Sequence, residues 1–168
     1  MIYVTSLARL HETVESCGAR HVVTLINDGT AVVRPETVPE ENHLFLGFND
    51  IVDPMEGMVL PAAYHVDQLV TFVEAWDRST PLVVHCFAGI SRSTAAAFIA
   101  ACALQPERDE AEIAKAIRKA SPTATPNSLL VALGDERLDR QGRMRMAAKA
   151  IGRGRDAFEG EPFMVAIE

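Results

Sequence analysis

Nine consecutive residues near the middle of the chain place a thiol, a guanidinium and a hydroxyl group at a spacing that suits nucleophilic attack on a phosphate ester. The segment spans residues 85–93 and reads His-Cys-Phe-Ala-Gly-Ile-Ser-Arg-Ser. A short apolar run rich in branched residues, 81–84, precedes it, and an Ala-rich segment of helical composition, 94–104, follows it. The sequence therefore predicts a loop between a strand and the N-terminus of a helix.

Each residue type in this loop has a chemical reason to be there. Free N–H groups and the positive end of the helix dipole make the start of a helix an anion site. The same field favours the thiolate form of Cys86, which would be the nucleophile. Arg92 carries a planar fork that matches two phosphate oxygens, Gly89 permits a tight turn, and Ser93 offers a hydroxyl to the sulfur.

This pattern resembles the signature loop of the cysteine-dependent protein tyrosine phosphatases, and the flanking sequence resembles their dual-specificity branch. The resemblance implies hydrolysis of a phosphate monoester through a cysteinyl-phosphate, with no cofactor. In such a reaction the charge that develops on the phosphoryl oxygens must meet fixed donors. The sequence offers the Arg92 guanidinium and the loop N–H groups, which belong to Phe87, Ala88, Gly89, Ile90, Ser91 and Arg92.

The leaving oxygen needs a proton, so a carboxyl group from another segment must reach the loop. In the resembled family an Asp on a loop after an upstream strand has this role, and residues 48–50 resemble that segment. Asp50 is our first choice because it is nearest the strand end, where α/β sheets bind ligands. Asp53 on the same loop is the alternative, and both could be ordinary loop acids.

Two possible roles are open for each of two further polar residues. By analogy, His85 orients the loop and helps to keep Cys86 ionised, but it could equally be a buried histidine with satisfied hydrogen bonds. Asn127 could position water at the site, although a polar residue of a first helical turn is the simpler reading. No metal is expected, because His85 and Cys86 would point to opposite sides of a strand and no second ligand pair is present.

Composition limits the class of protein. The chain has 168 residues, a net charge of −7 and three scattered cysteines, Cys17, Cys86 and Cys102. The charge argues against nucleic acid or an anionic membrane as a partner, and the cysteines argue against a disulfide framework. The same cysteine usage fits a reducing cytoplasm, which is the expected location, and no signal peptide or membrane-spanning segment is recognisable. Cys17 and Cys102 are expected to be packing residues.

The pattern of apolar residues predicts an α/β fold with a central, mainly parallel sheet of four to five strands flanked by helices. Strands are expected over 2–5, 21–26, 43–48 and 81–84, with a short strand possible at 31–33. Helices are expected over 7–16, 62–76 and 94–104, after an Asp109/Glu112 capping pair, and after an N-cap at Thr125. Residues 1–141 would form the catalytic domain. Residues 142–168 would be a helical or loosely ordered extension, whose basic run is either a solvated face or a dock for an acidic partner.

The substrate is expected to be a phosphorylated protein or a small aryl phosphate, with phosphotyrosine first and phosphoserine or phosphothreonine possible. The variable loop positions carry no Lys or Arg, which disfavours a highly charged phosphoinositide. Two alternatives stay open: a module that binds a phosphorylated partner without turnover, and a sulfurtransferase of the rhodanese type. The sequence leaves the oligomeric state undetermined.

Overall fold

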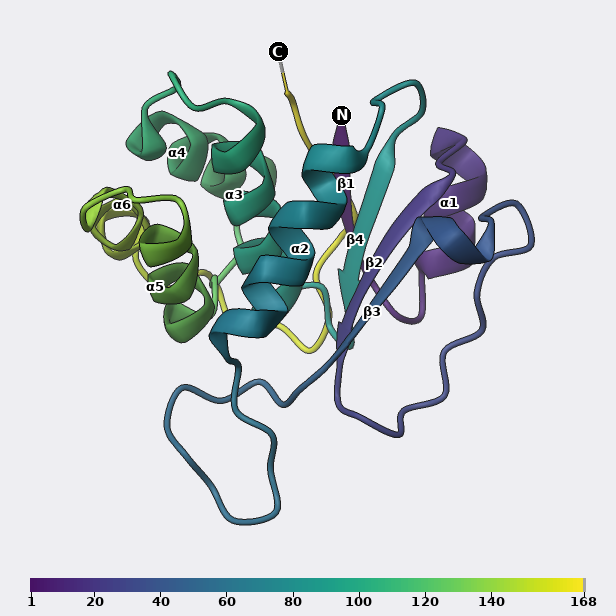
Figure 1. The fold of residues 1–168 in the computed structure, drawn as a ribbon, viewed down its shortest axis with the longest axis horizontal. Helices are drawn as coiled ribbons and strands as arrows, with labels where there is room; N and C mark the ends of the chain where they lie inside the picture. The colour runs from purple at the N-terminus through teal and green to yellow at the C-terminus, as the bar shows by residue number, and fades with distance from the viewer. Residues whose placement is uncertain (168) are drawn as a thin grey trace.

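The computed structural model describes residues 1–167, which form one five-stranded sheet with helices on both faces (Figure 1). The strands are β1 (Ile2–Ser6), β2 (His21–Ile26), β3 (His43–Gly47), β4 (Leu82–Cys86) and β5 (Phe163–Val165). The helices are α1 (Leu10–Cys17), α2 (Ala63–Ala75), α3 (Arg92–Leu104), α4 (Glu110–Ala120), α5 (Ser128–Arg137) and α6 (Arg143–Ile151), with a 3₁₀ turn η1 (Glu40–Asn42). The predicted fold class is confirmed.

The strand order places the end of β4 at the centre of one sheet edge. The order is β3-β2-β4-β1-β5, in which the first four strands are parallel and β5 runs antiparallel to β1. Ser6 at the end of β1 pairs with Cys86 at the end of β4, and Thr24 of β2 pairs with His85. Since the parallel strands end at the same edge, the segments that follow them meet around Cys86.

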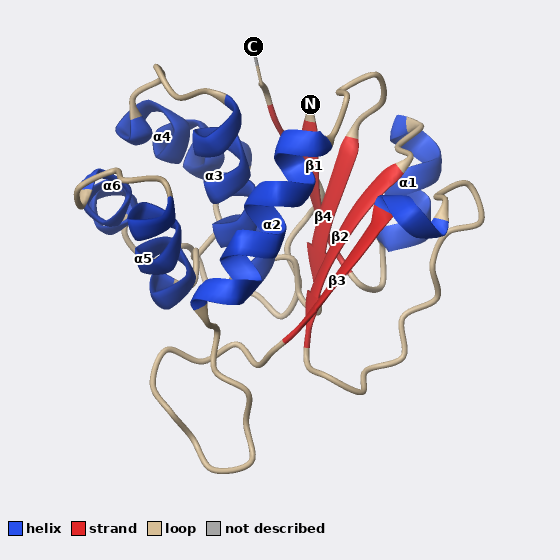
Figure 2. Cartoon of the chain, in the orientation of Figure 1, coloured by secondary structure: helices blue, strands red, loops and turns tan. Residues whose placement is uncertain are grey.

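Helices cover the two faces unequally (Figure 2). Helix α1 covers one face over a small core that includes Leu10, Val14 and Val83. Helices α2 to α6 lie on the other face, where α3 packs against α2, α4, α5 and the sheet. The small residues of α3 allow this central position, because its side chains from Ala95 to Cys102 are almost completely buried.

Three local predictions were wrong. Residues 31–33 form no strand and lead as coil into Pro35. Helix α1 begins at Leu10, later than expected, because Ser6 belongs to β1. Helix α5 begins at Ser128, since Asn127 caps it by accepting a hydrogen bond from the N–H of Leu130 at 3.0 Å. The predicted Asp109 cap of α4 is present, with the carboxylate accepting from two N–H groups.

The segment after residue 141 is joined to the rest of the fold at several places. Helix α6 packs against α4 and α5, and β5 adds to the sheet beside β1. The buried Asp135 carboxylate accepts hydrogen bonds from the N–H groups of Gly142, Met144 and Arg145 at the start of α6. Among residues 1–167, no helix has the length and apolar character that crossing a bilayer requires.

Candidate active site

The loop that joins β4 to α3 is fixed by hydrogen bonds to its backbone carbonyl oxygens. The carbonyls accept from backbone N–H groups of distant segments: Leu7 to Phe87 at 3.1 Å, Gly160 to Ala88 at 2.9 Å, Thr125 to Ile90 at 2.9 Å and Asn127 to Ser91 at 3.3 Å. Because these carbonyls point outward, the N–H groups of the loop face its inner side, where the N–H of Gly89 points at the sulfur of Cys86. This arrangement of N–H groups is what an anion requires.

Gly89 is the one position of the loop that has no room for a side chain. Its φ is +73°, and an added Cβ would lie 2.9 Å from backbone atoms of Thr5 and Ser6. A side chain here would therefore be strained in its backbone conformation and would also collide with β1. The glycine lets the loop turn against the sheet edge.

Cys86 is 2% exposed, and its sulfur lies on the inner side of this loop. The N–H of Gly89 donates to Sγ at 3.3 Å, and the hydroxyl of Ser93 lies 3.1 Å from it. Both groups can donate to a sulfur anion. The geometry thus brings Cys86, Gly89 and Ser93 together as the sequence predicted, although their catalytic roles remain predictions.

Arg92 is buried and has one side of its guanidinium fixed. Its Nη1 donates to Asn27 Oδ1 and to the carbonyl of Phe48, both at 2.7 Å. Its Nε is buried, with no hydrogen-bond partner among the described residues. A buried guanidinium N–H without a partner is costly, so this atom is suited to a phosphate oxygen. The guanidinium and the inward N–H groups of the loop are therefore donors that an oxyanion requires.

Asp50 lies at the base of the long loop between β3 and α2. Asn49 closes that base, because its N–H donates to the Val59 carbonyl and its side chain accepts from the Val59 N–H, both at 2.8 Å. Oδ1 of Asp50 accepts from Ser91 Oγ and Asn127 Nδ2, each at 2.8 Å. These contacts hold the carboxyl beside the signature loop and leave its second oxygen available.

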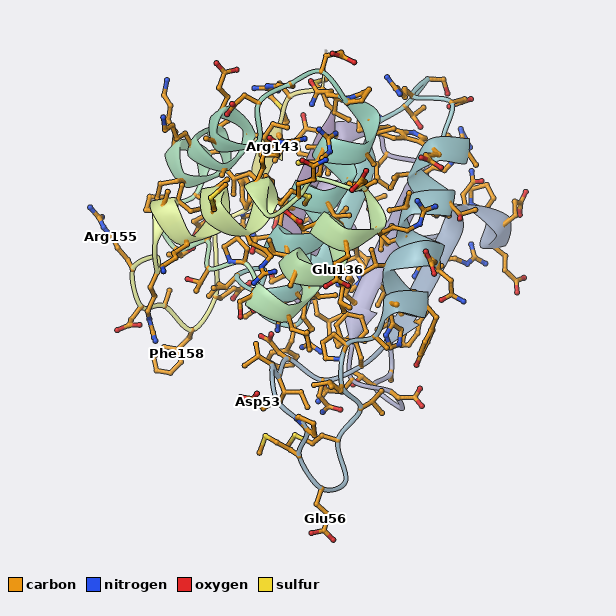
Figure 3. All side chains as sticks on the ribbon, turned by 60° about the vertical axis from the view of Figure 1, so that its left-hand side comes forward. Asp53, Glu56, Glu136, Arg143, Arg155 and Phe158 are labelled. Carbon is orange, nitrogen blue, oxygen red and sulfur yellow. The ribbon has the colours of Figure 1, made fainter. Side chains whose placement is uncertain are left out.

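Asp53 lies further out on the same loop. Figure 3 shows Asp53 on the side of the protruding loop and Glu56 at its tip, and both side chains are exposed. No hydrogen bond joins Asp53 to the signature loop within residues 1–167. The geometry therefore favours Asp50 over Asp53 as the carboxyl nearest the site.

His85 is fully buried behind the loop. Its Nε2 lies 2.7 Å from Thr24 Oγ1, which in turn lies 2.8 Å from Nε2 of His43. Its Nδ1 lies 3.4 Å from the carbonyl of Cys86. Burial lowers the pKa of His85 to about 4, so the imidazole is neutral at physiological pH. It can position the end of β4 through hydrogen bonds, but not as a nearby positive charge.

Two cavities flank Asp50. One, of about 480 Å³, is lined by Arg92, Asn27 and the apolar side chains of Phe87, Ile51 and Met58. The other, of about 540 Å³, is lined on one side by residues 50–53 and Met55, and on the other by Ser91 and residues 125–128. Phe87 is 66% exposed although it is a large aromatic residue. The first cavity therefore offers an apolar wall next to an anion site.

Sequence reasoning missed two contributors, Asn27 and Gly160, and left two interpretations of Asn127 open. Asn27 looked only like a turn residue, yet it holds Arg92; its position directly after β2 was an available signal. Asn127 is both a helix cap and a partner of Asp50, so its two readings are compatible. Gly160, which supports Ala88, has no signal in the sequence that connects it to the loop.

Three cysteines are present as free thiols. Cys102 is buried in α3, and burial raises the pKa of its thiol to about 12, which fits a packing role. Burial also raises the pKa of Cys17. Among residues 1–167, no three His, Cys, Asp or Glu side chains are grouped in a way that could hold a metal ion.

Comparison with known proteins relates this site to phosphatases. The sequence model of the protein-tyrosine phosphatase family matches residues 56–126, which include the signature loop. A search of the curated proteins finds no sequence match. The predicted resemblance to the protein tyrosine phosphatases is confirmed by the family match.

Solved structures place the fold among the dual-specificity phosphatases. The chain is similar to DUSP15 (16% identity, TM-score 0.65, covering 89% of each chain). It is similar to human DUSP28 (17% identity, TM-score 0.63, covering 83% of this chain and 92% of that one). It is also similar to the human tyrosine phosphatase-like serine/threonine/tyrosine-interacting protein (16% identity, TM-score 0.64, covering 83% and 92%). At these identities the likeness shows the fold.

Proposed function

We propose that this chain, which has the fold and the signature loop of the cysteine-dependent phosphatases, hydrolyses phosphate monoesters through a cysteinyl-phosphate at Cys86. The observation that carries the proposal is that one loop holds both the buried thiol of Cys86, which contacts the Gly89 N–H and the Ser93 hydroxyl, and the buried Arg92, whose Nε has no hydrogen-bond partner among residues 1–167. A guanidinium and a ring of N–H groups above a buried thiol form an arrangement suited to a phosphoryl group in transfer.

In the first step the thiolate of Cys86 attacks phosphorus. An S–P bond forms while the bond between phosphorus and the leaving oxygen breaks. The loop N–H groups and Arg92 bind the three non-reacting oxygens, whose charge they stabilise throughout. The carboxyl of Asp50 donates its proton to the leaving oxygen, so the product departs as a neutral alcohol or phenol.

In the second step a water molecule attacks the cysteinyl-phosphate. Asp50, now a carboxylate, takes one proton from that water as the new O–P bond forms. The S–P bond breaks, and the hydroxyl of Ser93 donates a hydrogen bond to the sulfur as it regains its negative charge. Inorganic phosphate leaves and the enzyme returns to its starting state.

The cavity walls favour an aryl phosphate, with phosphotyrosine of a protein as the first substrate class. Phe87, Ile51 and Met58 surround the approach to Arg92 and can pack against an aromatic ring. Phosphoserine and phosphothreonine would gain less from this apolar wall. A phosphoinositide is a poorer match, because the variable positions of the loop carry no extra cation. A reducing compartment such as the cytoplasm suits a catalytic thiol.

Steady-state hydrolysis of p-nitrophenyl phosphate and of a phosphotyrosine peptide tests the proposal. We expect Cys86→Ser to abolish turnover while it still binds phosphate, because the loop N–H groups and Arg92 remain. We expect the rate of Asp50→Asn to stay constant at high pH, because the decrease in the unchanged protein comes from ionisation of the required acid. Asp53→Asn is the matched control on the same loop and should keep the profile of the unchanged protein.

Unchanged turnover in Cys86→Ser would rule out the mechanism. If Asp53→Asn rather than Asp50→Asn altered the pH profile, the proton donor would be Asp53. Phosphate binding without turnover by the unchanged protein would favour the non-catalytic binding module. Transfer of sulfur from thiosulfate to cyanide would favour the sulfurtransferase.

A further inference from the structure

A third, larger cavity lies between α5 and α6, outside the site described above. Its volume is about 900 Å³. Its floor is apolar, with Val131, Ala132 and Ala148, and the 64% exposed Met146 stands at its side. Figure 1 shows α5 and α6 next to each other at the outer side of the helical layer. The cavity lies at the surface, because its lining residues Arg145, Met146 and Lys149 are exposed.

Three cations surround this apolar floor. Arg145, Lys149 and Arg153 line the cavity, and within residues 1–167 its lining includes no Asp or Glu. All three side chains are exposed. For Arg145 and Lys149, no carboxylate of the described chain lies within ion-pair distance, whereas Arg153 pairs with the exposed Asp156 at 2.5 Å. The chain as a whole has a net charge of −7, so this surface is a local exception that attracts acidic groups.

The cavity adjoins the candidate active site. Thr125, Pro126 and Ser128 line both this cavity and the one that contains Asp50 and Ser91. A peptide whose phosphorylated residue lies over Cys86 could therefore extend past Pro126 into the space between the helices. Arg145 and Lys149 are one helical turn apart, about 6 Å along the axis, and this distance matches the spacing between alternate residues of an extended peptide.

We propose that this cavity docks an acidic segment of the phosphorylated protein substrate, adjacent to the residue that is dephosphorylated. The proposal rests on the proposed phosphatase function and assigns its substrate class. Acidic side chains of the peptide would pair with the three cations, and its apolar side chains would pack on Val131 and Met146. Charge complementarity would mainly raise the rate of encounter and lower KM, since the cations do not touch the reacting atoms.

The test uses two phosphotyrosine peptides that differ only in flanking residues, one with three Asp or Glu on one side and one with Gln or Asn there. The variant is Arg145→Gln/Lys149→Gln/Arg153→Gln in the full chain. Its control is Arg20→Gln/Lys115→Gln/Lys119→Gln, which removes three exposed cations outside the cavity. Hydrolysis is measured with both peptides and with p-nitrophenyl phosphate, and peptide binding is measured by fluorescence anisotropy in the Cys86→Ser background.

We expect the cavity variant to lose roughly tenfold in kcat/KM and in affinity for the acidic peptide, as expected for three exposed charge pairs together. The neutral peptide and p-nitrophenyl phosphate should change less than twofold, and the loss should shrink as salt is raised. An equal loss in the control variant, or an equal loss for both peptides, would overturn the docking site. So would cation-dependent binding to phosphatidylserine vesicles with no preference between the peptides.

The two proposals fail in different ways. If the unchanged protein hydrolyses none of the three substrates, the proposed function fails, while the anisotropy measurement still decides whether the cavity selects the acidic peptide. If p-nitrophenyl phosphate is hydrolysed but the peptides do not differ, only the docking site fails.

Discussion

Replacing Asn27 by Ala tests whether the site depends on the orientation of Arg92. Asn27 Oδ1 accepts a 2.7 Å hydrogen bond from Nη1, and the Phe48 carbonyl accepts a second from the same nitrogen. A hydrogen bond to a charged group contributes about 1.5–3 kcal/mol. Asn27 is exposed, so water can replace its oxygen, and the Phe48 bond remains. We therefore expect a loss below this range, about 1 kcal/mol, or a roughly fivefold fall in kcat/KM.

The measurement is kcat/KM for p-nitrophenyl phosphate, together with the inhibition constant of inorganic phosphate. Arg92→Lys gives the upper limit, because it removes the planar fork and should cost roughly 10²-fold or more. Asp28→Ala is the matched control, since Asp28 is the next residue in the same exposed turn and bonds only locally to the N–H of Gly29. It should have no effect beyond twofold.

A double-mutant cycle separates orientation from general stability. If Asn27 acts through the guanidinium, Asn27→Ala should have no further effect on kcat/KM in the Arg92→Lys background. An Asn27→Ala loss that persists fully in that background would refute the reasoning. An effect no larger than that of Asp28→Ala would refute it as well.

Three other predictions follow from single contacts. Asp135→Ala removes the acceptor of three N–H groups at the start of α6 and should lower the free energy of unfolding by about 2 kcal/mol in urea titrations, with Asp135→Asn losing less. Gly160→Ala places a Cβ 2.9 Å from the Gly89 carbonyl and should lower kcat/KM roughly tenfold, whereas Phe158→Ala, at a fully exposed position, should not. Burial lowers the pKa of His85 from 6.5 to about 4 in the folded protein. As the pH falls, the unfolded chain therefore binds this proton first, and the free energy of unfolding should decrease by up to about 3 kcal/mol between pH 7 and pH 4. His85→Asn should flatten that dependence in urea titrations at pH 7, 5 and 4, and an unchanged slope would contradict the assignment.

Much of the signature loop could be predicted because it is continuous in sequence. The spacing of Cys86, Gly89, Arg92 and Ser93 predicted a strand, a turn and a helix start, and the structure has these elements. Such local features depend on φ, on helix caps and on neighbours a few residues away. The parallel sheet was also predictable, because apolar runs alternate with helical segments.

The strand order and the C-terminal strand could not be predicted. Strands β1 and β2 are parallel as expected, but β4 lies between them, and only this order brings Asn27 and Leu7 to the two sides of the loop. β5 has three residues and no strong pattern of its own. It forms because β1 offers it a free edge, which is a property of the assembled sheet.

By itself, the sequence determined the residues that could do the chemistry: a thiol at the end of a strand, a guanidinium at the start of the next helix, and two aspartates after another strand. Only the tertiary structure decided which partners complete the site. Asp50 lies beside Ser91 and Asn127, Arg92 is held by Asn27, and Gly160 supports Ala88 from the far end of the chain. The physical reason is that hydrogen bonds between segments depend on their positions after packing, which local spacing does not specify.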